Sequence, residues 1–536
     1  MSRPPQRWRL VVGFAVLGAV AVIAVVLIVS GSGGSADAVR AGASAGPASS
    51  GDPASSIAPR LRPRSPITIG GPVGQPIKAG FLGLSIEFQA VRAYTGRDPR
   101  HINPVLVQLI RNITPDQAPV LRIGGDSTDV SWVPTPGVTP PPDVTYRLTP
   151  GWFATTVALA RTLNAKLIVG LNLAADQPAL AAAEARRDVS AFGSSLKAFE
   201  IGNEPNVYDI IPDYHTPSGQ KITSRPRGYD YADYLPEFRA TVAALPRLQL
   251  AGPALATGPP PDKGSWIHSM PSFLSTESRV RTLTIHRYPL RNCFVGPRSP
   301  QYPTVTHLLA GYATNVLDES VRGYVAIAHS HGRELRVDEL NSVACRGKAG
   351  VSDTFAAGLW VLDALFGLAR TGVDGVNLHT LPRAAYQLFK FSHAGGHWRA
   401  SVPPVYYGLD MFARAAPPGS RLLKIGRPAR GPQLSIWATR APDGQVQAVL
   451  INKGPQSQVV TLRPPAGTTA PATVLRMQAP SVHARRGVTI GGASFGAETS
   501  TGVLPPSHTQ SLPPSRGAYT LSVPRASAAL LTFGPA

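Results

Sequence analysis

A short stretch in the first half of the chain decides the fold: Ala198-Phe199-Glu200-Ile201-Gly202-Asn203-Glu204-Pro205. It is an apolar strand pattern that stops at two polar side chains and a proline. Seven further short apolar runs share this form, and longer amphipathic segments such as 104–113, 152–163, 229–245, 315–328 and 355–369 separate them. The eight expected strands are 81–87, 120–124, 166–172, 198–204, 249–254, 283–288, 335–339 and 375–379. Eight βα units over residues 78–412 predict a (β/α)8 TIM barrel.

Polar residues at the strand ends favour a barrel over a doubly wound sheet. In barrels the chemistry lies at the carboxyl ends of several different strands. Here seven of the eight expected strands end in, or are followed by, such side chains: Ser85 and Glu87, Asp126 and Asp129, Asn172, Asn203 and Glu204, His286 and Tyr288, Glu339, and Asn377 and His379. We therefore expect one catalytic face that collects these residues.

The hydrophobic pattern of the sequence changes after about residue 413. Short alternating runs at 433–439, 446–452, 459–462, 473–477 and 519–523 are broken by Gly and Pro, which predicts an antiparallel β-sandwich over 413–536. An N-terminal segment, 67–77, contains the run 67–69, which we expect to add a strand to this domain. The sandwich would then be built from both ends of the chain.

The N-terminal region predicts export. Residues 10–29 are an unbroken apolar run of about the ~20 residues that cross a bilayer, and Arg3, Arg7 and Arg9 in the tail 1–9 precede it. The positive-inside rule keeps those arginines cytoplasmic and places the catalytic part outside the cell. We expect an uncleaved single-pass anchor; the alternative is a signal peptide, with residues 1–38 removed and the protein secreted. Residues 30–66 are a Gly/Ser/Ala/Pro linker, which we expect to be disordered.

Composition excludes several classes of protein. The 536 residues are 43% hydrophobic, which is incompatible with a wholly disordered chain. The net charge of +21 suits acidic partners such as anionic glycans, although the arginines are scattered. Neither a phosphate-binding loop nor a helix-turn-helix or zinc-finger spacing is present in the sequence, so we expect no nucleic-acid partner and no metal or organic cofactor. The oligomeric state stays open.

Two carboxylates point to glycoside hydrolysis. Glu204 and Glu339 end the fourth and seventh expected strands, and such side chains meet across the mouth of an eight-stranded ring. Glycosidases need two carboxyl groups beside the scissile bond, one as the acid and the other as the nucleophile or as the base that activates water. The gap between them, which decides between retention and inversion, is left open by the sequence.

The motifs around these carboxylates resemble one family. Residues 199–206, with Asn203-Glu204-Pro205, are similar to the acid/base segment of the clan A retaining glycosidases, and 337–343, with Asp338-Glu339, resemble the nucleophile segment of glycoside hydrolase family 79, the β-glucuronidase and heparanase group. The segments 83–87 and 121–129 resemble that family's first two strands. The segments 449–453 and 488–495 resemble its β-domain. Together they run in the family's order over residues 70–536.

The resemblance implies roles for the residues nearest the carboxylates. Glu204 would be the acid/base and Glu339 the nucleophile of a double displacement. Asn203 would bind the sugar 2-hydroxyl, and Tyr288 would donate to Glu339. For the loop after Glu339, which binds the substrate carboxylate in the family, we expect Arg346, Lys348 and Tyr386 as ligands, because Ala344 stands where the family often has Tyr.

Further residues are expected to line the pocket. His286 would shape its floor, and Ser85, Glu87, Asp126 and Asn172 would each either bind sugar hydroxyls or form hydrogen bonds within the loops and the core. Asp126 stands where the family usually has Asn, which adds negative charge. Glu200, beneath Glu204, would pair with Arg122.

The two cysteines are expected to pair. Cys293 and Cys345 follow the sixth and seventh strands, and neighbouring βα loops lie side by side on a barrel. An even cysteine count in an exported protein permits one bridge. We therefore predict a disulfide at the wall of the pocket.

The resulting hypothesis is an exported retaining β-glycoside hydrolase, first of all a β-glucuronidase. One alternative is a clan A β-glycosidase for a neutral sugar, which the Asp126 and Ala344 departures would suit. A second alternative is a non-catalytic glycan-binding protein of the envelope, against which the presence of both Glu204 and Glu339 argues.

Overall fold

The structure is a computed structural model that describes residues 65–534 except 213, 216–217, 260–265, 428–429, 432 and 466–469. The predicted membrane or signal segment 10–29 lies outside these residues, as do the predicted tail 1–9 and residues 30–64 of the predicted linker 30–66. Within the described ranges, every helix is too short or too polar to cross a bilayer.

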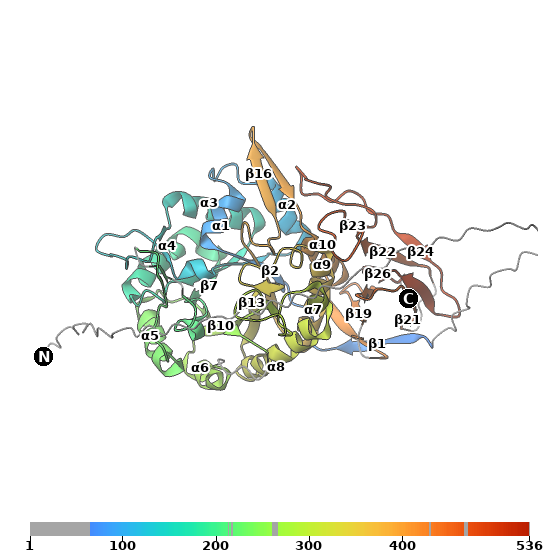
Figure 1. Ribbon diagram of the computed structural model, residues 1–536, viewed down its shortest axis with the longest axis horizontal. Helices are drawn as coiled ribbons and strands as arrows, with labels where there is room; N and C mark the ends of the chain where they lie inside the picture. Colours follow the sequence, from blue (N-terminus) through green and yellow to red (C-terminus); the bar gives the residue numbers. More distant parts are fainter. Residues whose placement is uncertain are drawn as a thin grey trace, which may run out of the picture. The chain divides into compact units, whose positions relative to one another are not determined.

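Eight parallel strands of the described chain close into a barrel (Figure 1). The order around the ring is β10-β11-β13-β15-β2-β3-β6-β7, so each strand neighbours the barrel strands before and after it in the sequence. The predicted strands are confirmed, with ends that differ by a few residues. The strands are β2 (Leu82–Ile86), β3 (Val120–Ile123), β6 (Lys166–Leu171), β7 (Leu196–Ile201), β10 (Leu250–Thr257), β11 (Val280–Arg287), β13 (Glu334–Leu340) and β15 (Gly375–Thr380).

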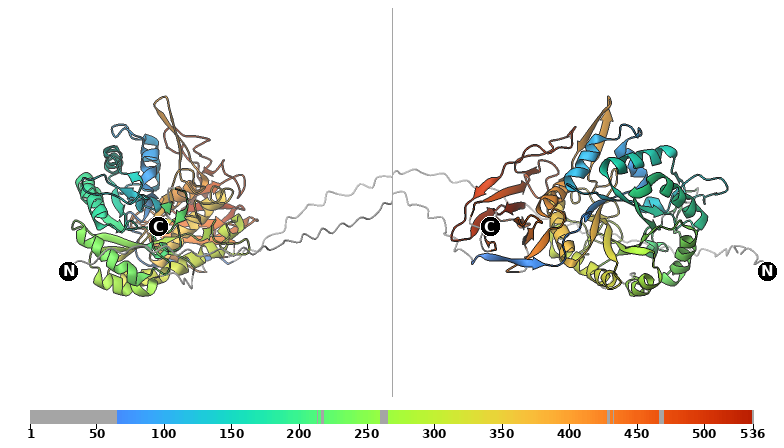
Figure 2. Two further views of the ribbon diagram at one scale, coloured as in Figure 1. Left: turned by 60° about the vertical axis from the view of Figure 1, so that its left-hand side comes forward. Right: turned by 180° about the vertical axis from the view of Figure 1, so that it is seen from behind.

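Helices follow the strands and cover the outside of the barrel (Figure 2). They include α1 (Phe88–Thr95), α2 (Pro104–Ile113), α3 (Pro150–Leu163), α4 (Pro178–Phe192), α5 (Tyr231–Ala244), α6 (Met270–Thr276), α7 (Val305–Leu309), α8 (Asn315–Ser330), α9 (Phe355–Thr371) and α10 (Pro404–Ala415).

Local sequence explains where the helices begin. The side chain of Asn103 accepts hydrogen bonds from the N–H groups of Val105 and Leu106, and Pro104 occupies the first turn of α2, where no N–H is needed. At α5, Asp230 and Asp233 form a capping box. These caps fix the residues at which α2 and α5 begin.

Small elements stiffen the loops that follow the strands. They are β4 (Ser131–Trp132) with β5 (Tyr146–Arg147), β8 (Tyr214–His215) with β9 (Lys221–Ile222), and β12 (Leu290–Arg291) with β14 (Val343–Ala344). A hairpin of β16 (Lys390–Ala394) and β17 (His397–Ser401) projects beyond the barrel helices in Figures 1 and 2. The pair β12–β14 joins the loops after β11 and β13.

The C-terminal part is a β-rich domain, which fits the predicted sandwich. Its sheet runs in the order β23-β22-β26-β20-β19-β18-β1-β21-β25, with β24 beside β22. Its strands are β18 (Arg421–Ile425), β19 (Leu434–Arg440), β20 (Val446–Asn452), β21 (Gln458–Arg463), β22 (Ala472–Gln478), β23 (Thr489–Ile490), β24 (Gln510–Leu512), β25 (Tyr519–Val523) and β26 (Ser527–Thr532).

The N-terminal strand β1 (Ile67–Val73) belongs to this β domain. It pairs antiparallel with β18 and parallel with β21, and Figure 1 shows it in blue beside the orange and red strands. Ile69 from β1 lies in one apolar core with Ile436, Leu450 and Leu521. The β domain is therefore made from both ends of the described chain, as predicted.

Helix α9 is buried because it packs against the barrel and the β domain together. Phe366 of α9 stacks on Trp437 of β19, with ring centroids 5.7 Å apart. The buried carboxylate of Asp363 accepts hydrogen bonds from Arg430 (3.0 Å), Lys453 (2.8 Å) and the Trp437 indole (2.8 Å). These cations hold the pKa of Asp363 below its usual range against the effect of burial. The β domain is thereby fixed to the helix that follows the Glu339 strand.

Candidate active site

Glu204 lies at a sharp change of chain direction after β7. Its φ is 54°, a left-handed conformation that is strained for a residue with a side chain. Its N–H donates to the carbonyl of Ala254 at 3.0 Å, and the short helix Pro205–Val207 follows. Such strain persists only where the surroundings enforce it, and here it turns the carboxyl group away from the strand into the site.

Glu339 is placed by an irregularity in β13. Along β11, Ile285 and His286 are consecutive, but their partners on β13 are Val337 and Glu339, so Asp338 is an extra residue. The pairing with β15 contains the same offset between Val337 and Leu340. A β-bulge of this kind re-aims side chains, and strands bulge often beside active sites. The neighbouring carboxyl groups of Asp338 and Glu339 consequently both reach the interior of the barrel.

Glu204 and Glu339 converge as the sequence predicts. One carboxylate oxygen from each, together with a ring nitrogen of His286, lie within 4.8 Å of one another. His286 Nδ1 is 2.9 Å from Glu204 Oε1 and 3.9 Å from Glu339 Oε2. About a quarter of the Glu204 side chain is exposed, whereas Glu339 is nearly buried. Two carboxyl groups in different surroundings can take opposite roles in proton transfer.

Glu339 is held as an ionised carboxylate. Burial by itself would raise its pKa, but the charges of nearby His379, His286 and Arg122, and the hydrogen bond from Tyr288, hold that pKa below its usual range. Arg122 Nη1 donates to Oε2 at 2.7 Å and Tyr288 Oη donates to Oε1 at 2.8 Å. Burial lowers the pKa of His379 itself to about 4, so Arg122 is the permanent cation at neutral pH. Both oxygens of Glu339 are therefore fixed in direction.

Arg122 connects most of the barrel floor. Fully buried on β3, it donates to Glu200 at 2.6 Å, which confirms the expected pair, and to Asn203 Oδ1 at 2.9 Å. It also donates to Ser85 Oγ at 3.2 Å, and Ser85 lies 3.1 Å from His379 Nδ1. One guanidinium thus positions the proposed nucleophile and the Asn203 amide together.

Two further carboxyl groups face the pair. Burial, then the nearby Asp126 and Glu339, raise the pKa of Glu87 to about 8, although Ser127 donates to it. Asp126 reaches the solvent but is otherwise enclosed by protein; that enclosure, then Glu339 and Glu204, raise its pKa to about 7. Asn203 Nδ2 is 3.5 Å from Asp126 Oδ1. At mildly acidic pH these groups are neutral and can donate hydrogen bonds to a sugar.

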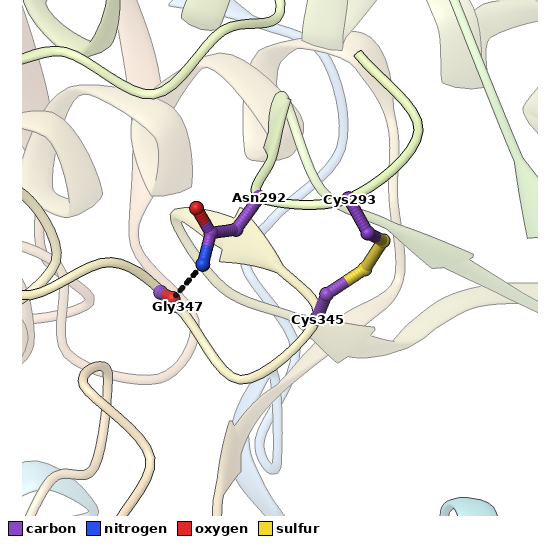
Figure 3. The surroundings of a disulfide bond; sticks show 4 residues. All are labelled: Asn292, Cys293, Cys345 and Gly347. Carbon is purple, nitrogen blue, oxygen red and sulfur yellow. Dashed lines mark hydrogen bonds between the residues drawn. A yellow bond between two sulfur atoms is a disulfide. The ribbon is translucent and has the colours of Figure 1, made fainter.

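A disulfide between Cys293 and Cys345 ties the loops after β11 and β13, the pair that the sequence predicts (Figure 3). Figure 3 also shows Asn292 Nδ2 donating to the Gly347 carbonyl, at 3.2 Å. Gly347 has a φ of 76°, and a Cβ there would come within 3.0 Å of Tyr386. The disulfide loop therefore packs closely on Tyr386, whose ring centroid is 5.7 Å from that of His379 and 6.1 Å from that of Tyr288.

Three residues expected to bind sugar have other partners. Asn172 is buried, and its amide binds the backbone at Asp129, Ser131 and Ala175. Ser85 is fully buried beneath Glu339. These two side chains are held by protein atoms in the site, and sugar binding by either of them stays a prediction.

The third residue, Lys348, is turned to Tyr302, with its ammonium 4.6 Å from the ring centroid and 3.3 Å from the hydroxyl. Arg346 differs from it because its guanidinium is exposed and close enough to His379 to lower the pKa of that ring. Arg346 is therefore the more exposed of the two cations, and a substrate contact by either of them stays a prediction.

The sequence alone assigned no specific role to two buried acids. Asp129 accepts from Tyr208 Oη at 2.8 Å and from the N–H of Asn203 at 3.2 Å, which fixes the segment before Glu204. Asp338 lies within 3.6 Å of both Arg122 and His286. The position of Asp338 directly before Glu339 is the sequence signal that could have indicated its role. Strict alternation along a strand, however, would turn the Asp338 side chain away from the interior of the barrel.

The described residues offer two sets of ligands that a metal ion would accept: Glu204, His286 and Glu339, and, beneath them, Glu200, His286 and Asp338. Arg122 already contacts Glu339 and Glu200 with its own positive charge. We assign no metal to either set. A cleft of about 850 Å³ on the β domain, between Ile67 and Val459, has no carboxylate among the described residues that line it and is a poor candidate for this chemistry.

Comparisons with known proteins agree with this arrangement. Residues 436–530 match the C-terminal beta domain of glycosyl hydrolase family 79. A beta-glucuronidase of Aspergillus niger is 23% identical over 414 residues, which cover 70% of this chain and 72% of that protein.

Solved structures share the fold at low identity. A 4-O-alpha-L-rhamnosyl-beta-D-glucuronidase from Fusarium oxysporum superposes with a TM-score of 0.66 and 20% identity, over 87% of this chain and 99% of that one. A GH51 arabinofuranosidase from Xanthomonas axonopodis gives a TM-score of 0.62 at 13% identity, over 88% and 100% of the two chains. Barrel and β domain therefore occur together in enzymes that cleave different sugars.

Proposed function

The chain is a glycoside hydrolase of family 79, and from this premise we propose that it is a retaining β-glucuronidase with Glu204 as the acid/base and Glu339 as the nucleophile. The family assignment removes the alternative of a non-catalytic glycan-binding protein. The specific sugar and the two roles are the proposal.

The separation of the two carboxyl groups carries the proposal. Retaining glycosidases hold their carboxyl groups about 5 to 5.5 Å apart, whereas inverting enzymes leave about 6.5 to 9.5 Å for a water molecule. The nearest oxygens of Glu204 and Glu339 lie within 4.8 Å. This upper limit between single oxygen atoms fits the shorter of the two spacings and supports direct attack by one carboxylate on the anomeric carbon.

In the first step Glu339 attacks the anomeric carbon while Glu204 gives its proton to the departing oxygen, and a glycosyl-enzyme ester forms. In the second step Glu204 takes a proton from water, and the resulting hydroxide displaces Glu339. Arg122 and Tyr288 keep Glu339 ionised and aimed, and the amide of Asn203, held by Arg122, is available for the sugar 2-hydroxyl.

The segments that follow three neighbouring barrel strands carry positive charge alone, which favours an anionic sugar. The segments 288–317, 341–352 and 381–409, which follow β11, β13 and β15, contain no Asp or Glu. Among the described residues, no Arg or Lys of these segments forms an ion pair, so their charge is available to a substrate. These residues are Arg291, Arg298, Arg346, Lys348, Arg383, Lys390 and Arg399.

Arg346 and Tyr386 are the nearest candidates for the substrate carboxylate. Arg346 is exposed and close to His379, and Tyr386 lies between His379 and Tyr288. The relatives from A. niger and F. oxysporum are both named as glucuronidases, which supports a uronate substrate. A neutral sugar remains the second candidate, because Asp126 would repel a uronate wherever it is ionised.

We further propose that residues 10–29 anchor the enzyme in the membrane or direct its secretion. Their apolar length and the arginines before them support export with the catalytic domain outside the cell.

The experiment that tests the function is hydrolysis of aryl β-glycosides by a chain that begins at Ser65. The panel compares the glucuronide with the glucoside, galactoside and xyloside, and NMR follows the first anomer released. We expect the glucuronide to be cleaved with retention. Glu204→Gln and Glu339→Gln should each abolish turnover, and azide should restore turnover of an activated glycoside by an alanine variant of Glu204. Glu498→Gln, the same change at an exposed site on the β domain, is the matched control.

The outcomes separate the candidates. Cleavage of a neutral glycoside alone would keep the two carboxylate roles and overturn the uronate assignment. Release of the inverted anomer would overturn the double displacement.

A further inference from the structure

Two carboxyl groups beneath the active site face each other without a donor between them. Glu200 on β7 and Asp338 on β13 are fully buried, and one carboxylate oxygen of each lies within 4.8 Å of the other. Among the described residues, no N–H or O–H group donates to Glu200 Oε1 or to either oxygen of Asp338. Two ionised carboxylates in such contact repel each other, and a buried unpaired charge is costly. One of the two must therefore carry a proton.

The proton belongs on Asp338. Arg122 Nε donates to Glu200 at 2.6 Å but lies 3.6 Å from Asp338, so the guanidinium stabilises an ionised Glu200 more than an ionised Asp338. Burial, followed by the nearby Glu200, raises the pKa of Asp338 well above its usual range. The pKa of Glu200 stays below its usual range: Arg122 and the contact with Asp338 outweigh burial.

His286 connects this buried pair with the acid/base carboxyl group. Its Nε2 lies 3.6 Å from Asp338 Oδ1 and has no hydrogen-bond partner among the described residues, whereas its Nδ1 lies 2.9 Å from Glu204 Oε1. A neutral imidazole has one N–H donor and one acceptor nitrogen. The atom that faces Nε2 therefore decides what Nδ1 can offer to Glu204.

We propose that Asp338 is a positioning residue for proton donation. Its O–H is directed to Glu200, so its other oxygen can only accept, and this oxygen keeps His286 in the Nε2–H tautomer. His286 Nδ1 is then an acceptor, and it binds the protonated carboxyl of Glu204 as an O–H···N hydrogen bond. The opposite tautomer would donate from Nδ1 and stabilise Glu204 after its proton has left.

The other charged groups around Asp338 fit this assignment. Arg122, Glu200, His286 and Glu339 contact it or lie beside it, and Arg336 acts on it from the lower barrel. With Asp338 neutral, the single charge of Arg122 faces two carboxylates, Glu200 and Glu339. An ionised Asp338 would add a third negative charge in the same enclosed space.

This inference rests on the proposed function, since it assigns the acid role to Glu204. A structural role for Asp338 would weaken the enzyme equally for every substrate. A role in proton donation has a different signature, because a good leaving group departs without help and a poor one needs the acid.

The kinetic test compares Asp338→Leu with Asp338→Asn on aryl glycosides with good and poor leaving groups. For the poor leaving group, Asp338→Leu should lose about tenfold or more in kcat/KM, part of the ~10²–10⁴-fold that a general acid contributes. The loss should be small for the good leaving group. The alkaline limb of the pH profile should move to lower pH, because the protonated form of Glu204 has lost its acceptor.

Asp338→Asn is the conservative variant. Its amide N–H can donate to Glu200 while its oxygen accepts from His286, so it should recover most of the activity that Asp338→Leu loses. Asp410→Asn is the matched control: Asp410 is also a buried carboxyl, but it lies on α10 and pairs with Arg414. That control should leave the leaving-group dependence and the pH profile unchanged.

A second measurement needs no activity. Infrared spectra of the wild-type protein at neutral pH, with ¹³C-labelled aspartate, should contain the C=O stretch of a protonated aspartic acid that is missing in Asp338→Asn. Selective ¹⁵N-histidine NMR should find His286, identified by its loss in His286→Gln, in the Nε2–H tautomer.

Each result is decisive. Equal losses for good and poor leaving groups, an ionised Asp338, or a His286 protonated at Nδ1 would overturn this inference and leave the hydrolase proposal intact. If the wild-type enzyme cleaves no β-glycoside, the proposed function fails, and the spectra still decide the state of Asp338.

Discussion

Removal of the Tyr288 hydroxyl tests how the nucleophile is kept ionised. Tyr288 Oη donates to Glu339 Oε1 at 2.8 Å, and Arg122 holds the other oxygen. In Tyr288→Phe the ring remains and only this hydrogen bond is lost. A hydrogen bond to a charged group contributes about 1.5–3 kcal/mol. Because one pKa unit corresponds to about 1.4 kcal/mol, the pKa of Glu339 should rise by about 1–2 units.

The direction of the pH effect follows from the depressed pKa of Glu339. A carboxyl group with a lowered pKa is active above that pKa and loses activity as the pH falls through it. In Tyr288→Phe the acid limb of kcat/KM should therefore move to higher pH. With one oxygen of Glu339 unrestrained, kcat should also fall at neutral pH, by about tenfold or more.

The assay is the pH profile of hydrolysis of the best aryl glycoside. Tyr94→Phe is the matched control, since Tyr94 is a buried barrel tyrosine whose hydroxyl binds Thr380 at 3.0 Å. It should lower stability slightly and leave the acid limb in place. An unmoved limb in Tyr288→Phe would refute the assignment of Tyr288 as the group that holds Glu339 ionised.

Three further predictions concern charge and cross-links. Enclosure by protein, Glu339 and Glu204 raise the pKa of Asp126 to about 7. Asp126→Asn should therefore increase kcat/KM for an anionic glycoside above that pH and match the wild type below it. A ratio of variant to wild-type kcat/KM that does not change with pH would contradict this. Breaking a buried ion pair costs about 3–5 kcal/mol, so Asp363→Asn should lower Tm by several degrees in calorimetry at neutral pH. Since the pKa of Asp363 is depressed, the deficit should disappear only in strong acid; an undiminished deficit there would contradict it. Cys293→Ser should remove about 4 kcal/mol by the chain-entropy relation for a 52-residue loop; equal Tm values for oxidised protein and variant would exclude this contribution.

The fold could be predicted because its signals are local. Each barrel strand is a short apolar run followed by a polar end, and each helix between them has an apolar face or a cap, as at Asn103 and Asp230. The hairpin β16–β17 was not predicted. Its residues, from Lys390 to Ser401, alternate little and are mostly exposed, so the sequence there has no buried face to reveal a strand.

The two catalytic carboxylates could also be predicted, but the buried side chains and contacts around them could not. Glu204 and Glu339 are visible because they end strands. The place of Asp338 depends on a bulge, which breaks the alternation on which sequence reasoning relies. Asn172 has the right position on its strand, yet its amide is engaged by the backbone of the loop after β3, a contact between distant segments. Partners of this kind depend on tertiary geometry.

Strand β1 has a consequence for the order in which the chain can fold. It pairs with β18 and β21, and the entire barrel separates it from these strands in the sequence. During synthesis β1 therefore stays unpaired until β18 and β21 have emerged, after the whole barrel. A fragment that starts after Val73 would lack the strand between β18 and β21 and expose two unpaired edges. The sheet of the β domain is therefore complete only when β1, from the N-terminal end of the described chain, pairs with β18 and β21.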